Sequence, residues 1–103
     1  MTALLDITSS EKKLLLSMLE KHLPNTTVWA YGSRVKGTAR PSSDLDLVVF
    51  IAPEAQSAVS ALRDAFDESN LPFRVDLFVW DDIPEKFRET IQTVHVKLQE
   101  KAK

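Results

Sequence analysis

The stretch that decides the fold reads DLDLVVFI and runs from Asp44 to Ile51. It is apolar like a buried strand, yet Asp44 and Asp46 occupy two of its first three positions. Because side chains alternate between the two faces of a strand, both carboxylates point the same way. Like charges held side by side raise each other's pKa unless a cation lies between them. Mg²⁺ suits this place, since it binds one or two carboxylates and completes its shell with water and substrate phosphates.

A third aspartate interrupts a second apolar run, RVDLFVW, at residues 74–80. If this run neighbours the first one in a sheet, Asp76 joins Asp44 and Asp46 on one face. Three carboxylates around two metal ions about 3.5–4 Å apart support in-line phosphoryl or nucleotidyl transfer. In that arrangement we expect Asp76 to lie on the nucleophile side and to help deprotonate the acceptor. Each aspartate alone also has a structural interpretation, such as pairing of Asp76 with Arg74.

Upstream of these aspartates, a β-rich segment ends in Gly32-Ser33. A turn of this kind presents free backbone N–H groups, and glycine lets a phosphate approach the backbone closely. The Ser33 hydroxyl can donate to a phosphate oxygen. Arg34, Lys36 and Arg40 follow in the same loop, and the first two are our candidates for phosphate contacts because they are nearest to Ser33. The alternative for each cation is a solvated basic loop.

Periodicity and turn residues predict helices that alternate with strands in the order α-β-α-β-α-β-α. Thr8 and Glu11 have the spacing of a capping box at the start of the first helix. The later elements are expected at residues 26–31 (strand), 33–36 (short helix), 44–51 (strand), 53–68 (helix) and 71–80 (strand). We expect Asp82, with Glu85, to cap the last helix. The apolar stripe of that helix comprises Phe87, Ile91, Val94 and Leu98. This alternation indicates an α/β layer structure, in which helices cover one sheet.

Composition limits the classes of function. A chain of 103 residues with 44% hydrophobic residues predicts a single domain over residues 1–103. The 13 basic and 15 acidic residues give a net charge of −2, which argues against holding nucleic acid by bulk electrostatics. The sequence has no cysteine, so it predicts no disulfide and no thiolate zinc site. We expect no signal peptide and no membrane span, and therefore a cytoplasmic protein.

The separate motifs combine into one compound pattern: G-S-x-x-x-G, a loop, S-D-x-D-L, and a later single aspartate. This pattern resembles the signature of the DNA polymerase beta-like nucleotidyltransferases. Gly32-Ser33, Gly37, residues 43–47 and residues 75–77 carry the resemblance. The shortness of the chain resembles the minimal nucleotidyltransferase (MNT) family, whose members are typically antitoxin partners of HEPN-domain ribonucleases.

The resemblance implies a fold, a reaction and a partner. The fold would be the polymerase beta-like nucleotidyltransferase fold, a small mixed sheet covered by helices. The reaction would be transfer of AMP from ATP to a tyrosine hydroxyl of a HEPN RNase toxin, which silences the toxin and requires a hetero-oligomer. Carried over by position, the catalytic residues and ligands of two Mg²⁺ ions would be Asp44, Asp46 and Asp76. The nucleotide-binding residues would be Gly32, Ser33, Arg34, Lys36 and Ser43.

Two other interpretations remain open from the sequence, and two more are disfavoured. The acceptor could be a small molecule such as an aminoglycoside, although so small a domain has little room for a separate acceptor pocket. The chain could also be an antitoxin that neutralises its toxin by binding alone. A structural α/β domain with incidental aspartates is disfavoured, because buried unpaired carboxylates are costly. A template-directed polymerase is disfavoured because nothing in the sequence forms a basic channel for a nucleic-acid strand.

Overall fold

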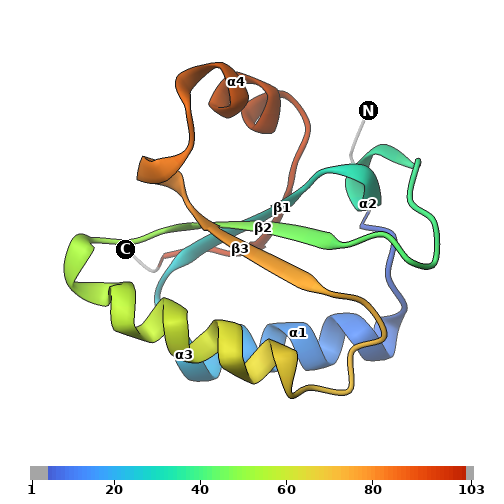
Figure 1. The fold of residues 1–103 in the computed structure, drawn as a ribbon, viewed down its shortest axis with the longest axis horizontal. Helices are drawn as coiled ribbons and strands as arrows, with labels where there is room; N and C mark the ends of the chain where they lie inside the picture. The colour runs from blue at the N-terminus through green and yellow to red at the C-terminus, as the bar shows by residue number, and fades with distance from the viewer. Residues whose placement is uncertain (1–4, 102–103) are drawn as a thin grey trace.

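The structure, a computed structural model, describes residues 5–101 and contains one four-stranded sheet (Figure 1). The strands are β1 (Thr27–Tyr31), β2 (Leu45–Phe50), β3 (Val75–Val79) and β4 (Val96–Gln99). The α-helices are α1 (Ser9–His22), α2 (Ser33–Lys36), α3 (Gln56–Asp67) and α4 (Glu85–Thr93). Two 3₁₀ turns, η1 (Pro53–Ala55) and η2 (Trp80–Asp82), precede α3 and α4. The expected α/β class is confirmed.

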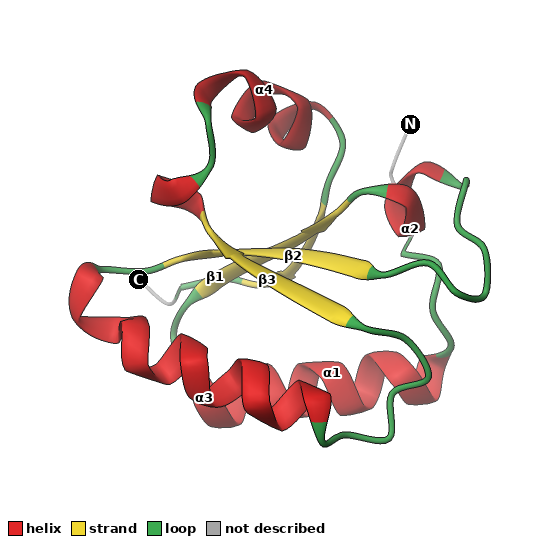
Figure 2. Ribbon diagram, viewed as in Figure 1, coloured by secondary structure: helices red, strands yellow, loops and turns green. Residues whose placement is uncertain are grey.

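The sheet is mixed, with the strand order β3-β2-β1-β4. β1 runs antiparallel to both β2 and β4, whereas β2 and β3 are parallel. Helices α1 and α3 lie side by side across one face of the sheet, and α4 stands over the other face (Figure 2). This arrangement gives the sheet one face covered by two long helices and one face covered only by a short helix.

The two faces differ in what they bury. Alternate positions of β2, such as Leu45, Leu47 and Val49, belong to the main core with residues of α1 and α3. The other face holds a smaller cluster around Val48 and Ile91, with the rings of Trp29, Tyr31, Phe50 and Trp80 packed against it. Asp46 and Val48 are two residues apart on β2, so the strand periodicity places the Asp46 side chain on the α4 face.

The helices of the structure begin largely as the sequence predicts. The capping box of α1 is confirmed, because Glu11 N donates to Thr8 Oγ1 at 3.1 Å and Thr8 N donates to Glu11 Oε1 at 2.8 Å. The expected cap of α4 by Asp82 is wrong: its N-cap residue is Pro84, without a side-chain cap, and Asp82 lies in η2. Proline fixes its own φ and suits a helix start, so α4 begins directly after Pro84, and Asp82 lies two residues before this cap. No helix within residues 5–101 combines the length and apolarity needed to cross a membrane.

The prediction for the last helix is wrong beyond Thr93. The chain leaves α4 at Val94, which has an extended backbone, and then forms β4 on the free edge of β1. The expected stripe could not distinguish the two outcomes, because Val94, Val96 and Leu98 also alternate as strand residues do. These three side chains pack against the main core. Valines favour a pleated surface, and pairing with β1 satisfies backbone groups that an edge strand leaves open.

Candidate active site

Parallel pairing of β2 with β3 brings two of the three candidate aspartates together. In the register of the two strands, Asp46 lies directly opposite Asp76. Neighbouring strands lie about 4.8 Å apart, so the two carboxyl groups share a small space on the α4 face. Asp44 lies just before β2, is exposed, and contributes to the same negative field. The condition stated from the sequence, that the two apolar runs be neighbours, is therefore met.

Among the three aspartates of the cluster, Asp46 has a raised pKa. Burial first, and then the charges of Asp76 and Asp44, together raise the pKa of Asp46 from 3.8 to about 6. A carboxylate with this pKa is held in an unfavourable position for its own charge. A divalent cation between the carboxylates would reverse the balance, because the positive charge stabilises the ionised forms.

The turn at Gly32 lies directly beside Asp46. Gly32 has φ 87° and ψ −158°, a conformation open essentially to glycine alone. A β-carbon at Gly32 would stand 2.5 Å from Asp46 Oδ2, closer than atoms tolerate. The glycine is therefore needed for its backbone and also for the space that Asp46 occupies. Ser33 begins α2 directly after this turn and is partly buried.

Tyr31 is a residue of the site that the motif search did not single out. It pairs with Asp46 across β1 and β2, and its ring lies 6.2 Å from the ring of Phe78 on β3. Burial raises the pKa of the Tyr31 phenol well above its ordinary value, and the charges of Asp46 and Asp76 add to the effect. The phenol therefore stays protonated beside the carboxylates. The sequence could have indicated this residue, because Tyr31 directly precedes Gly32 and is the last residue of its strand.

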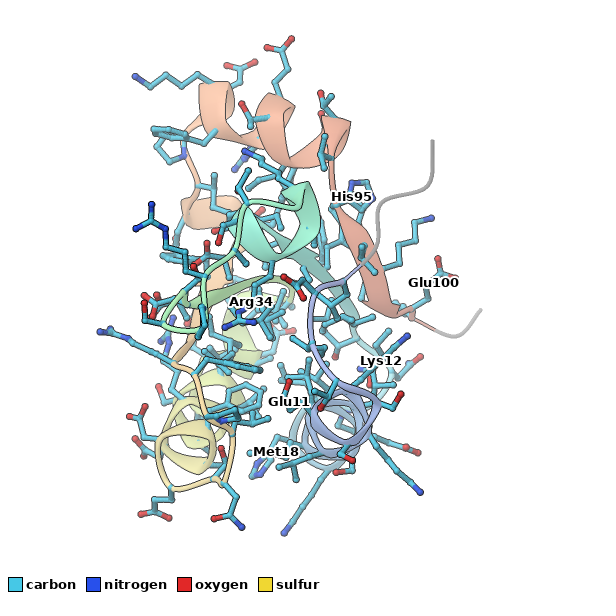
Figure 3. The ribbon with its side chains drawn as sticks, turned by 90° about the vertical axis from the view of Figure 1, so that its right-hand side faces the viewer. Glu11, Lys12, Met18, Arg34, His95 and Glu100 are labelled. Atoms are coloured by element: carbon cyan, nitrogen blue, oxygen red, sulfur yellow. The ribbon has the colours of Figure 1, made fainter. Side chains whose placement is uncertain are left out.

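Arg34 has a different environment from the one expected of a phosphate ligand. Its side chain is buried, with 7% exposure, in the middle of the molecule between α2 and the two long helices (Figure 3). Its guanidinium donates to three backbone carbonyls: Ser43 O at 2.9 and 3.1 Å, Asp6 O at 2.9 Å and Pro41 O at 3.3 Å. It also lies over the ring of Phe73, 4.3 Å from the centroid. Arg34 thus holds the loop that ends at Ser43 and delivers Asp44.

The remaining nucleotide candidates lie on the rim of the site. Lys36 is exposed at the end of α2 and lines a groove together with Gly32. The Ser43 hydroxyl accepts a hydrogen bond from Arg40 N at 2.8 Å, so it closes the loop before Asp44. Gly37, whose φ of 75° ends α2 in a left-handed turn, has open space around it. The loop is therefore held by Arg34 from inside and by Ser43 at its end.

The carboxylates of the site suit Mg²⁺ once Asp76 leaves its ion pair with Arg74. Asp76 Oδ1 accepts from Arg74 Nε at 2.8 Å, and the Arg74 side chain is 72% exposed. With the side chains in these positions, no three Asp, Glu, His or Cys residues between 5 and 101 are arranged to hold one metal ion. An exposed ion pair contributes little stability, so Arg74 can release Asp76 at small cost. Carboxylate oxygens are the ligands that Mg²⁺ prefers.

Comparison with known proteins agrees with this geometry. The sequence profile of the nucleotidyltransferase domain matches residues 11–100. The chain belongs to the nucleotidyltransferase family. It is also 48% identical over 102 residues to a Haemophilus influenzae protein named probable protein adenylyltransferase MntA, covering 98% of this chain and 90% of that protein. The matched region of this nucleotidyltransferase includes all the candidate residues named above.

Solved structures share the fold of this nucleotidyltransferase. A toxin–antitoxin with AMP-PNP superposes with a TM-score of 0.61 at 20% identity, covering 86% of this chain and 73% of that one. A complex of a tri-AMPylated Shewanella oneidensis HEPN toxin with its MNT antitoxin superposes with a TM-score of 0.55 at 14% identity, covering 91% and 73%. At these identities the likeness concerns the fold, and the expected polymerase beta-like nucleotidyltransferase fold is confirmed.

Proposed function

We propose that this nucleotidyltransferase transfers AMP from ATP to a tyrosine hydroxyl of a HEPN-domain RNase toxin and thereby acts as its antitoxin. The observation that carries the proposal is the register of Asp46 opposite Asp76 beside the Gly32 turn. The reaction class follows from the family and from this site. The acceptor is supported by the relative named as a protein adenylyltransferase and by the folds shared with toxin–antitoxin complexes.

In the proposed reaction, the chain positions the triphosphate and the acceptor on opposite sides of Asp46. The backbone at Gly32 and Ser33, with the cation of Lys36, binds the β- and γ-phosphates. The acceptor oxygen attacks the α-phosphorus, the bond from that phosphorus to the bridging oxygen breaks, and pyrophosphate leaves with the electron pair. Asp76, on the acceptor side, takes the phenolic proton directly or through water.

Asp44, Asp46 and Asp76 are the residues that would hold Mg²⁺, as two ions. The bound metal would neutralise charge on the phosphates and lower the pKa of the attacking hydroxyl. The side chains of Asp44 and Asp46 would orient the metal, and the absence of a β-carbon at Gly32 leaves the space that the Asp46 carboxylate occupies. Arg34 is left out of the proposed phosphate contacts, because its donors are engaged with backbone carbonyls.

The experiment is a labelling assay with α-labelled ATP, Mg²⁺, this chain and a HEPN-domain protein from the same genome. We expect label on a tyrosine of the HEPN protein, and loss of the label with Asp44→Asn/Asp46→Asn. A complex that forms and silences the RNase without any label would instead identify an antitoxin that acts by binding. Label on an aminoglycoside but not on the protein would move the acceptor to a small molecule.

A further inference from the structure

A groove lies beside the carboxylates, and apart from Gly32 and Lys36 its lining residues have no role in the proposed phosphate binding. It has a volume of about 580 Å³, within the usual range of roughly 300–1,000 Å³ for ligand sites. Its walls come from the end of β1, from β3 and from α4, which stands over this face of the sheet (Figure 1). The apolar lining residues are Tyr31, Phe78, Ile83, Pro84, Phe87 and Ile91.

The groove leaves aromatic surface in water. In the part of the chain that the structure describes, the large hydrophobic side chains that stay exposed are Phe78, at 41%, and Phe87, at 53%. Both line this same groove, one from the sheet and the other from α4. Exposed apolar surface gathered in one concave place indicates contact with another molecule.

The groove is continuous with the carboxylate cluster. Phe78 follows Asp76 by two residues on the same face of β3, a separation of about 6.6 Å along the strand. Tyr31, on the opposite wall, pairs with Asp46. Gly32 and Lys36, the proposed phosphate contacts, also line the groove, and Gly32 lies against Asp46. A molecule in the groove therefore reaches the reacting centre from the side of Asp76.

We infer that this groove binds the acceptor tyrosine of the partner protein, with the ring beside Phe78 and Phe87 and the hydroxyl at Asp76. The inference rests on the proposed function and adds the place where the acceptor binds. The two-residue step from Phe78 to Asp76 is comparable with the length of a tyrosine side chain from its β-carbon to its hydroxyl. Stacked and edge-on aromatic contacts favour such a ring.

The adenine of ATP fits the groove less well than a phenol. A purine has several hydrogen-bonding atoms along its edges, and leaving these unpaired in an apolar site is unfavourable. The polar side chains that line the groove are few, namely Lys36, Asp82, Thr90 and the hydroxyl of Tyr31, and the rest of its side chains are apolar. Adenine also gives no reason for Phe87 to stay half exposed, whereas a protein partner would cover it.

The test measures two affinities by calorimetry without any transfer. The ligands are the HEPN-domain protein and the magnesium complex of α,β-methylene ATP, an analogue that cannot be cleaved at the α-phosphorus. The variants are Phe87→Ala, whose exposed ring contributes little to folding, and Phe78→Ala. Met18→Ala is the matched control, since Met18 is partly buried on α1, on the far side of the sheet.

We expect both phenylalanine variants to weaken binding of the HEPN protein at least tenfold and to leave the affinity for the analogue within twofold. Met18→Ala should change neither affinity. A tenfold loss for the analogue with unchanged partner binding would assign the groove to the nucleobase and overturn the inference. So would unchanged values for both ligands, or a wild-type chain that binds no HEPN protein. Partner binding that depends on the groove, without any labelling by the wild type, would contradict the proposed transfer while keeping the docking site.

Discussion

Gly32 and Asp46 lie so close together that a β-carbon on the glycine would be 2.5 Å from the carboxylate oxygen Oδ2. The turn after β1 and the carboxylate of β2 are therefore adjusted to each other. Because Gly32 lies against Asp46, a phosphate bound at this turn would also lie next to the Asp46 carboxylate. Gly37 provides a matched control for substitutions of Gly32, because it also has a positive φ but has open space where a β-carbon would lie.

We predict that Gly32→Ala abolishes most of the activity, whereas Gly37→Ala retains it. Both variants place a side chain at positive φ, which costs about 1–3 kcal/mol of stability. Only Gly32→Ala also displaces Asp46, and a displacement near 1 Å can reduce a rate by about 100-fold. The measurements are the initial rate of AMP transfer and the free energy of unfolding in urea. Equal losses of activity in the two variants would show that backbone strain, not contact with Asp46, is responsible.

The raised pKa of Asp46 predicts a trade-off between stability and activity. Folding raises this pKa from 3.8 to about 6, so between these values the native state binds more protons than the unfolded state. Stability of the magnesium-free protein should therefore fall as pH rises from about 4 to about 6 and stay lower above that. Asp46→Asn should remove this fall, raise the melting temperature at pH 7 and abolish transfer.

The melting temperature, measured from pH 4 to pH 7 in EDTA and again with Mg²⁺, checks this prediction. Added Mg²⁺ should raise the melting temperature of the wild type at pH 7 and leave Asp46→Asn little changed. Asp64→Asn, at an exposed position of α3, is the control for loss of one negative charge. A wild-type protein whose stability rises with pH in this interval would contradict the assignment.

Substitutions of Arg34 and Lys36 should have different effects, because Arg34 has a structural role and Lys36 is proposed to bind the nucleotide. A lysine at position 34 has all its donors on one nitrogen, whereas Arg34 donates from three separate nitrogens to these carbonyls, so Arg34→Lys should lower the free energy of unfolding by about 2–4 kcal/mol. Lys36→Met should leave stability unchanged, because Lys36 is exposed, and should raise the KM for ATP. Urea denaturation and steady-state kinetics measure the two effects. If Arg34→Lys keeps full stability and loses ATP affinity, Arg34 binds phosphate after all.

Release of Asp76 from Arg74 should make the metal easier to bind. We predict that Arg74→Ala changes the free energy of unfolding by less than about 1 kcal/mol, since an exposed pair contributes little. The Mg²⁺ concentration for half-maximal activity should fall, because Asp76 no longer has a competing cation. Lys97→Ala, which breaks the exposed pair with Glu100, is the control and should change neither quantity. A higher magnesium requirement in Arg74→Ala would show that the arginine supports the site.

The sequence predicted the features of this molecule that depend on nearby residues. The alternation of Asp44, Leu45 and Asp46 fixed the face of β2 that carries charge. The Gly32 turn and the capping box at Thr8 are local as well, and both were found as expected. The neighbourhood of β2 and β3 could only be stated as a condition, because strand order depends on the packing of the whole chain.

Features that depend on distant contacts were missed. Val94 and Leu98 fit a helix and a strand equally well, and the free edge of β1 decided between them. Arg34 was predicted to bind phosphate because it follows Ser33. Its actual partners are carbonyls at Asp6 and in the loop at 41–43, and sequence spacing does not place these segments together. A buried arginine of this kind can be recognised only when its surroundings are known.

Helix α4 connects β3 to β4, and these are the two edge strands of the sheet. The chain between them therefore crosses above all four strands, from one border of the sheet to the other. It follows β3, whose pairing with β2 places Asp46 opposite Asp76, and it leads into β4, which pairs with β1, so the residues of α4 itself belong to neither ladder. Changes in α4 can thus reshape the proposed docking groove while the carboxylates keep their register, so under the proposed function partner choice can diverge between relatives without loss of the chemistry.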